Sequence, residues 1–275
     1  MSQRPRHGPT ESIDRTLERG WAAFDDGHVE DALALATTAL RRTPGNPDAT
    51  LLRAACRIEL GEPAAALADL DPLGTEDVSA EVLFFRGLAL YDLARVSEAR
   101  TVLERAVAIE PEWCDAHYEL ARALDHLGDD DGARRHYRRA HALHADGHPL
   151  PLEIDDAEFD ALVKGTLRAL PAAVRKELGD VPVVVEPAPS AELLQASDPP
   201  LPPDLLGLFV GPSLLEQSHG DLPSLPPTIY IFRKNLLRAC ADRDELAEQV
   251  AITVQHEVGH MIGADEKTLE DWGLG

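Results

Sequence analysis

This 275-residue chain has few basic residues compared with its number of acidic residues. There are 26 Lys and Arg against 49 Asp and Glu, which gives a formal charge of −23. The deficit is shared, because residues 1–150 carry a net charge of −10 and residues 151–275 a net charge of −13. Phosphate backbones and anionic membrane surfaces would repel such a chain, so neither nucleic acid nor membrane is an expected partner. A well-solvated surface is the simplest reading of the charge.

Cysteine is also scarce. The three residues, Cys56, Cys114 and Cys240, are widely spaced and form no C-x-x-C pair. This odd, scattered set argues against a disulfide framework and against cysteine-ligated zinc, and it favours a reducing compartment. No run of 18 or more apolar residues predicts a membrane span, and the N-terminus has no apolar stretch typical of a secretory signal. We therefore expect a cytoplasmic protein whose residues 1–12 are disordered.

One segment near the C-terminus combines metal ligands with a general base. Residues 256–266 read H-E-x-x-H-x-x-G-x-D-E. Two imidazoles four residues apart lie on one face of a helix, so His256 and His260 can bind the same metal ion. Glu257 directly follows the first histidine and can act as general base on a metal-activated water. Gly263 then lets the chain leave the helix so that a third ligand can return to the metal.

The residues before this motif predict the helix that carries it. Asp242 with Glu245 three residues later is typical of a capping box at a helix start. An apolar stripe with a spacing of four residues follows, formed by Leu246, Val250, Val254, Val258 and Ile262. The two histidines fall away from that stripe, beside Gln249 and Thr253, as a cleft requires. The alternative interpretation is a polar helix face with two incidental histidines.

The third metal ligand is expected at the eleventh position of the motif, which is Glu266. Asp265 is adjacent and is the runner-up. A carboxylate beside two imidazoles is an ordinary ligand set for zinc, with water at the fourth position. The sequence therefore predicts one zinc ion per chain.

Further short motifs occur in a fixed order through the C-terminal half. They are D-D-A-E-F at 155–159, V-V-V-E at 183–186, G-L-F-V-G at 207–211, I-Y-I-F-R at 229–233 and the segment from Asp242 to His260. In these motifs, residues 154–274 resemble the small zincin-like metallopeptidases, also called minimal zincins. The resemblance implies a zincin-like fold and metal-dependent hydrolysis of a peptide or protein substrate. The family usually has Asp at the eleventh motif position, where this chain has Glu266, so the ligand class is unchanged.

The rest of this half predicts a small α+β domain. Residues 156–178 indicate one or two helices interrupted at Pro171, and residues 181–186 indicate a strand. Residues 187–227 are rich in proline and are expected to be mostly loop, with G-L-F-V-G as a turn. Residues 228–232 alternate as a strand, which we expect at the upper edge of the cleft, where an extended peptide can pair with it. Tyr230 and Arg233 are substrate-cleft candidates on this position alone.

Residues 13–146 repeat with a period of 33 or 34 residues. Small residues recur in two positions of each repeat, namely Gly27, Gly61, Ala94 and Gly128, and Ala32, Ala66, Ala99 and Ala133. This period is typical of tetratricopeptide repeats, each a pair of helices. About four repeats are predicted. The second is degraded, because Pro63 follows Gly61 and Gly74 stands where its second helix should end.

The repeats have two interpretations. Their concave groove can hold a protein partner, or the array only supports the catalytic half. Arg53, Arg57 and Arg86 are the basic residues that could line a peptide-binding groove. The function predicted is that of a zinc-dependent metallopeptidase with a recruiting repeat domain. The alternative is an interaction protein whose metal-bound domain has little or no peptidase activity.

The predicted fold is thus mainly α with a small α+β domain. A tetratricopeptide α-solenoid over residues 13–146 is followed by a linker, 147–153, and by a minimal zincin-like domain, 154–275.

Overall fold

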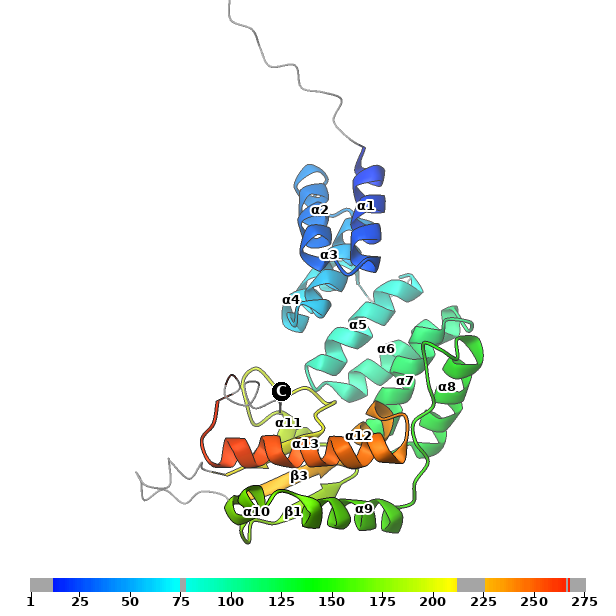
Figure 1. The fold of residues 1–275 in the computed structure, drawn as a ribbon. Helices are drawn as coiled ribbons and strands as arrows, with labels where there is room; N and C mark the ends of the chain where they lie inside the picture. The colour runs from blue at the N-terminus through cyan, green and yellow to red at the C-terminus, as the bar shows by residue number, and fades with distance from the viewer. Residues whose placement is uncertain (1–11, 75–77, 212–225, 266, 268–275) are drawn as a thin grey trace, which may run out of the picture. The chain divides into compact units, whose positions relative to one another are not determined.

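A computed structural model describes residues 12–74, 78–211, 226–265 and 267 (Figure 1). The chain divides into two compact units, residues 1–123 and 124–275, and the division falls inside the helix α7 (Cys114–His126). The boundaries expected at residues 13, 146 and 154 stay predictions. Disorder is expected for residues 1–12. Residues 1–11 lie outside the described residues, and the described part of the chain begins at Ser12. No helix in the described part of the chain is long and apolar enough to cross a bilayer.

The N-terminal repeats form helix pairs joined by tight turns. Successive helices from α1 to α6 pack against one another. The pairs are α1 (Ile13–Asp25) with α2 (Val29–Arg42), α3 (Pro47–Glu59) with α4 (Pro63–Leu70), and α5 (Ala80–Asp92) with α6 (Val96–Ile109). The fourth repeat supplies α7 and α8 (Asp130–Leu143). This arrangement confirms the α-solenoid predicted from the 34-residue period.

The recurring small residues have two separate structural roles. Gly27, Gly61 and Gly128 occupy the turns with φ of 79°, 72° and 79°, and Ala94 occupies the equivalent turn with φ of 57°. A positive φ is the conformation in which glycine is least strained. The second set of positions is fully buried between helices, with exposures of 0–2% at Ala32, Ala66, Ala99 and Ala133. Small side chains at these positions let neighbouring helices approach closely.

The three arginines that could line a peptide-binding groove form ion pairs and hydrogen bonds with other residues of the repeats. Arg53 and Arg57 both form ion pairs with Asp69, at 2.5 and 2.7 Å. Arg86 is buried, and its guanidinium donates to the carbonyls of Leu70 and Gly74 at 2.7 and 2.9 Å. These carbonyls follow the short helix α4, which ends in the 3₁₀ turn Asp71–Leu73. The arginine thereby satisfies carbonyl groups left by the degraded second repeat.

The C-terminal unit contains a small sheet in the order β1 (Val183–Glu186), β3 (Thr228–Phe232), β2 (Gly207–Val210). β1 runs parallel to β3, with Val183 opposite Ile229. β2 runs antiparallel to β3, with Gly207 opposite Ile231. Among the described strands, β3 is therefore central and β2 lies at an edge.

Helices cover this sheet (Figure 1). They are α9 (Asp156–Ala169), α10 (Ala172–Leu178), α11 (Ala191–Leu194), α12 (Arg233–Ala239) and α13 (Arg243–Met261). α13 packs against β2, β3, α9 and α10. Their shared core includes Phe159 from α9, Ile229 and Ile231 from β3, and Val250 and Val254 from α13. The break between α9 and α10 confirms the interruption predicted at Pro171.

Two expectations about the sheet are wrong. Residues 207–210 of the G-L-F-V-G motif form strand β2 and not a turn. The strand 228–232 is paired on both sides and is not an edge. Both errors have one cause. β2 pairs with a strand about twenty residues further along the chain, and a non-local pairing leaves little trace in a short apolar stretch between prolines.

Candidate metal and catalytic site

Helix α13 begins as its capping residues predict. The Asp242 side chain accepts hydrogen bonds from the backbone N–H groups of Asp244 and Glu245, both at 2.9 Å. The Glu245 carboxylate in turn accepts a hydrogen bond of 2.6 Å from the backbone N–H of Ala241. The predicted apolar stripe is buried from Leu246 to Val258. This burial fixes the rotation of the helix and so decides where the remaining faces point.

The two histidines lie together on another face of α13. Their Nε2 atoms are 2.9 Å apart, and the ring centroids are 4.6 Å apart in an edge-to-face arrangement. Both residues are partly exposed. Two nitrogens bound tetrahedrally to one zinc ion at ~2.0–2.1 Å would be about 3.3 Å apart. The pair therefore fits a shared metal ion with little adjustment of either side chain.

Glu257 is buried, with 6% of its surface exposed. Its Oε2 accepts a hydrogen bond of 2.6 Å from the backbone N–H of Phe209 in β2. The Leu206 carbonyl accepts from Phe232 N–H, so alternate residues of this segment bond to β3. By that alternation, the N–H of Phe209 points to the side of β2 that no described strand covers. Glu257 therefore places its carboxylate at this edge of β2.

Gly207 allows this contact between α13 and β2. A Cβ at this position would lie 2.5 Å from Cγ2 of Thr253 and 3.1 Å from the Tyr230 carbonyl oxygen. It would also lie 3.4 Å from Cγ of Glu257. Any larger residue would push the helix away from the edge strand at the level of Glu257. Gly207 and Phe209 were missed as site residues, although the sequence signalled them through the G-L-F-V-G motif.

The chain leaves α13 through a glycine turn, as the motif predicts. Gly263 has φ of 90°. Its N–H donates to the His260 carbonyl, and the N–H of Ala264 donates to the Gly259 carbonyl, both at 2.9 Å. This pair of hydrogen bonds is a Schellman motif, which ends a helix and redirects the chain. Asp265 follows as an exposed residue. Glu266, the expected third ligand, lies outside the described residues.

The structure places the two cleft candidates of the central strand away from each other. Ile229 and Ile231 face the core that contains α13, so Tyr230 lies on the opposite face of β3, where its ring is 6.4 Å from that of Phe232. Arg233 begins α12 and forms an ion pair with Asp156. Neither residue is thereby brought to the face of α13 that carries the histidines.

Comparisons with known proteins match different families to different parts of the chain. Residues 178–274 match the family model described as zincin-like metallopeptidase. Residues 23–83 and 84–148 match two models described as tetratricopeptide repeat. An uncharacterized protein of Rhizobium meliloti (strain 1021) is 40% identical over 91 residues, or 32% of this chain. The match spans 21% of that relative, about a fifth of its length.

Several solved structures are similar to part of this chain. A crystal structure of MamA protein is 24% identical, with 48% of this chain and 73% of that chain covered and a TM-score of 0.40. A thermophilic TPR protein of Thermus thermophilus is 20% identical, with 60% of this chain and 86% of that chain covered and a TM-score of 0.45. The motif order, the sheet and the match over residues 178–274 agree on a zincin-like metallopeptidase domain in the C-terminal part of this chain, preceded by tetratricopeptide repeats.

Proposed function

We propose that the chain is a zinc-dependent metallopeptidase. The observation that carries the proposal is the arrangement of three side chains on α13. His256 and His260 bring their Nε2 atoms to 2.9 Å, and the intervening Glu257 is buried against the edge strand. A purely structural metal site needs the histidines but has no use for a buried carboxylate beside them. The carboxylate therefore favours a hydrolytic site over the alternative of an interaction protein with an inert metal domain.

His256 and His260 would hold the metal, with Glu266 as the third ligand and Asp265 as the runner-up. The glycine turn at Gly263 supports this choice, because it redirects the chain immediately before these carboxylates. When bound, zinc supplies Lewis acidity: it lowers the pKa of a water molecule towards ~7 and polarises the carbonyl of a scissile peptide bond. Two imidazoles and one carboxylate leave a fourth position open for this purpose.

Glu257 would act as the general base. Its carboxylate removes a proton from the attacking water and later passes a proton to the leaving amine. The hydrogen bond from the N–H of Phe209 at 2.6 Å holds Oε2 and fixes the direction of the carboxylate. The other oxygen, Oε1, would face the reacting water. Burial of the Glu257 side chain between α13 and β2 also restricts its rotation.

The substrate would be an extended peptide beside β2. The side of this strand that no described strand covers carries the N–H and carbonyl of Gly207 and the carbonyl of Phe209, which can pair with a peptide as an added strand. Because Glu257 uses the N–H of Phe209, the added peptide would run directly past the catalytic base. This assignment replaces β3, which is paired on both sides.

The repeats would recruit a protein partner or the substrate itself, as arrays of this type support protein–protein interaction. The three free cysteines suit a reducing compartment such as the cytoplasm.

Metal analysis of the purified protein tests the proposal. We expect about one zinc ion per chain, which His256→Ala and His260→Ala both remove. A chelator should abolish cleavage of a peptide library, and added zinc should restore it. Full metal content in both histidine variants would refute the site.

The third ligand has its own test. Glu266→Ala should weaken zinc binding far more than Asp265→Ala, because only the former residue occupies the eleventh motif position. The reverse ranking would transfer the role to Asp265. Zinc affinity measured by competition with a chromogenic chelator separates the two variants without requiring a substrate.

A further inference from the structure

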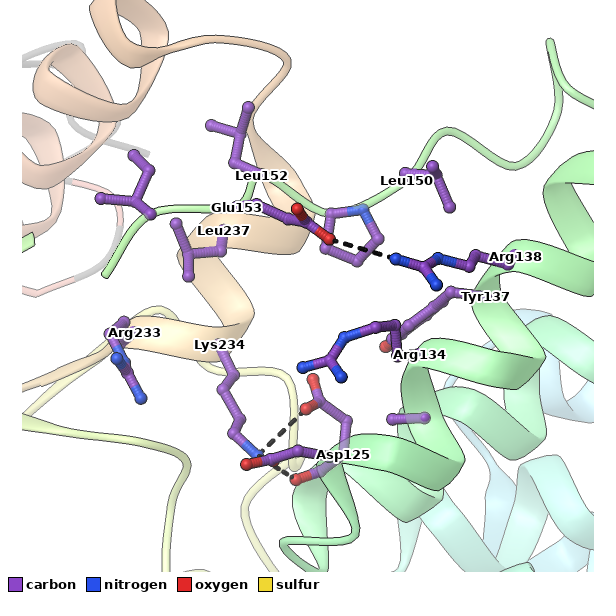
Figure 2. Close-up of a pocket in the computed structure, with 14 residues that line it drawn as sticks. Asp125, Arg134, Tyr137, Arg138, Leu150, Leu152, Glu153, Arg233, Lys234 and Leu237 are labelled. Atoms are coloured by element: carbon purple, nitrogen blue, oxygen red, sulfur yellow. Dashed lines mark hydrogen bonds and ion pairs between the residues drawn. The ribbon is translucent and has the colours of Figure 1, made fainter. Parts of the chain in front are cut away.

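A cavity of about 340 Å³ lies in the C-terminal unit, between α8, α12 and the segment 150–154 (Figure 2). The segment is attached to α12 by a hydrogen bond of 2.8 Å from Leu152 N–H to the Leu237 carbonyl. Small-molecule sites have volumes of about 300–1,000 Å³. None of the residues that line it belongs to α13, so the cavity is distinct from the candidate metal site.

One side of the cavity is apolar. Leu150, Pro151, Leu152 and Ile154 contribute from the segment, and Leu237 contributes from α12. Leu150 is 45% exposed although it is a large aliphatic residue. A ligand with an aliphatic part would cover this exposed surface and would be stabilised by the hydrophobic effect.

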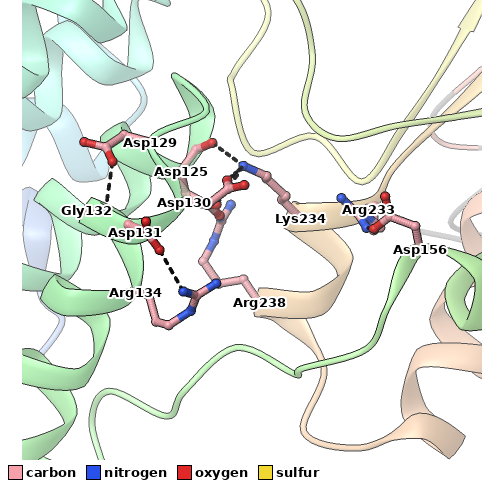
Figure 3. Close-up of polar contacts among 10 residues, drawn as sticks. All are labelled: Asp125, Asp129, Asp130, Asp131, Gly132, Arg134, Asp156, Arg233, Lys234 and Arg238. Atoms are coloured by element: carbon pink, nitrogen blue, oxygen red, sulfur yellow. Dashed lines mark hydrogen bonds and ion pairs between the residues drawn. The ribbon is translucent and has the colours of Figure 1, made fainter.

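The lysine at the floor of the cavity is already neutralised. Lys234 Nζ lies 3.0 Å from Asp125 Oδ1 and 2.5 Å from Asp130 Oδ1, and it donates to the Asp125 carbonyl at 2.8 Å (Figure 3). Asp125 also lies 3.8 Å from Nη1 of Arg238, so two cations balance the two carboxylates. The floor therefore favours neither an anion nor a cation strongly.

On the other side of the cavity, two arginines have N–H groups available to donate hydrogen bonds to a ligand. Arg134 and Arg138 are one helical turn apart on α8, and their side chains are 51% and 63% exposed. Arg134 pairs with Asp131 at 2.9 Å through Nη1. Arg138 lies 3.8 Å from Glu153, which is longer than a hydrogen bond. Each guanidinium has five N–H donors, so one contact leaves most of them free to bind a further acceptor.

We infer that this cavity binds a small amphipathic carboxylate. The carboxylate lies between Arg134 and Arg138, and the aliphatic part lies against Leu150 and Leu237. Guanidinium groups bind carboxylates with two parallel hydrogen bonds, which suits a planar anion at this place. Glu153 is 82% exposed and can turn into solvent when the ligand arrives. The ligand is a free aliphatic acid or the C-terminal residue of a peptide that ends in leucine or a similar side chain.

The pattern disfavours other ligand classes. An amine would meet two guanidinium groups and no uncommitted carboxylate except the exposed Glu153. A compact anion such as phosphate would pair with the arginines but would leave the apolar side uncovered. A neutral aliphatic molecule would leave the guanidinium groups without a partner. Only a ligand with both an anionic and an aliphatic part uses both sides of the cavity.

Ligand-observed NMR on the full chain tests the inference. The probes are octanoate and a tetrapeptide ending in leucine with a free carboxylate, compared with octylamine, inorganic phosphate and the amidated tetrapeptide. At least one of the two acids should bind with a Kd of roughly 0.1–1 mM, and the tighter acid identifies the source of the carboxylate. The comparison compounds should bind about tenfold more weakly or not at all.

The helix α8 offers a matched control. The double variant Arg134→Gln with Arg138→Gln should weaken binding of the acid about tenfold or more. The neighbouring pair Arg135→Gln with Arg139→Gln removes the same charge from the same helix, outside the lining, and should change Kd less than about twofold. Both pairs are exposed, so circular dichroism should show a folded protein in each case.

Four results would overturn the inference. They are no saturable binding of either acid at ~10 mM, equal binding of acid and amide, equal binding of phosphate, and equal effects of the two arginine pairs. Repeating the titration with His256→Ala should give the same Kd. Loss of binding in that variant would instead place the carboxylate on the metal. The inference does not rest on peptidase activity, so the two proposals fail separately.

Discussion

The two halves of the chain obtain a defined structure in different ways. In the repeats, one requirement recurs: a turn residue with positive φ and an alanine where helices meet, as at Gly61 and Ala66. In the C-terminal half, requirements are unique, as at Gly207, where one helix meets one strand. When one repeat departs from the recurring pattern, a neighbouring residue can compensate. Arg86 does so by donating hydrogen bonds to the Leu70 and Gly74 carbonyls of the second repeat. The contact at Gly207 occurs once in the described chain, so substitution of this glycine should affect the candidate catalytic site directly.

The largest expected effect is at the catalytic carboxylate. Glu257→Gln keeps the shape of the side chain but removes the base, so peptide cleavage should fall ~10²–10⁴-fold. Zinc content and thermal stability should change little. Glu248→Gln, an exposed substitution on the same helix, is the control and should leave the rate unchanged. Mass spectrometry of a digested peptide library measures both rates. Undiminished cleavage by Glu257→Gln would contradict the assignment of the base.

The contrast between unique and recurring glycines can be tested directly. Gly207→Ala places a methyl group 2.5 Å from Thr253 Cγ2, and such overpacking should cost about 1–3 kcal/mol and reduce activity. Gly61→Ala has open space around it, so its cost is backbone strain of about 1 kcal/mol in the repeats.

Each half contains a thiol that reports this loss separately. Cys56 is buried in the repeats and Cys240 in the C-terminal half, and burial raises the pKa of each thiol to about 11. Thiol labelling in increasing urea should therefore expose Cys240 earlier in Gly207→Ala and Cys56 earlier in Gly61→Ala. Thr253→Ser removes the opposing methyl group and should restore part of the stability of Gly207→Ala. Failure of that rescue would mean that the clash is not the cause.

The second compact unit, residues 124–275, should also be the more sensitive to acid. Burial, together with the charge of Arg238, lowers the pKa of His126 to about 4. In the unfolded chain this histidine titrates near ~6.5, so the unfolded state binds more protons between pH 6.5 and 4. Stability should therefore fall as the pH drops through that window, by roughly 1 kcal/mol between pH 7.5 and 5.5.

Urea unfolding followed by circular dichroism at pH 7.5, 6.5 and 5.5 measures this slope. His126→Gln should flatten it, whereas the exposed His28→Gln should leave it unchanged. An unchanged slope in His126→Gln would show that other groups cause the loss.

The smallest expected effect is a gain in the repeats. Ala94 occupies a turn with φ of 57°, the conformation that glycine holds in the equivalent turns. Ala94→Gly should therefore stabilise the repeats by about 0.5 kcal/mol, the relief of strain minus the higher entropy of the unfolded chain. Ala108→Gly, at an exposed helical position in α6, should instead cost about 0.5–1 kcal/mol. Protection of Cys56 from labelling measures both, and destabilisation by Ala94→Gly would contradict the turn argument.

The sequence by itself determined the features that depend on local spacing. A 34-residue period predicted the helix pairs, because each repeat carries its own turn and its own small contact residues. Asp242 and Glu245 predicted the start of α13, and the four-residue stripe predicted which of its faces is buried. The spacing of His256 and His260 predicted that both rings share a face, because the helix brings every fourth residue into register.

Only the tertiary structure decided which strand lies beside Glu257. β2 is four residues long and follows a proline-rich stretch, so its sequence resembles a turn, and its pairing with β3 is non-local. That pairing makes β3 central and directs the N–H of Phe209 to the side of β2 that no described strand covers. The contact of Glu257 with Phe209 and the need for glycine at 207 then follow from packing between segments about fifty residues apart. The cavity beside α12 arises in the same way, because α8 and α12 are far apart in the sequence.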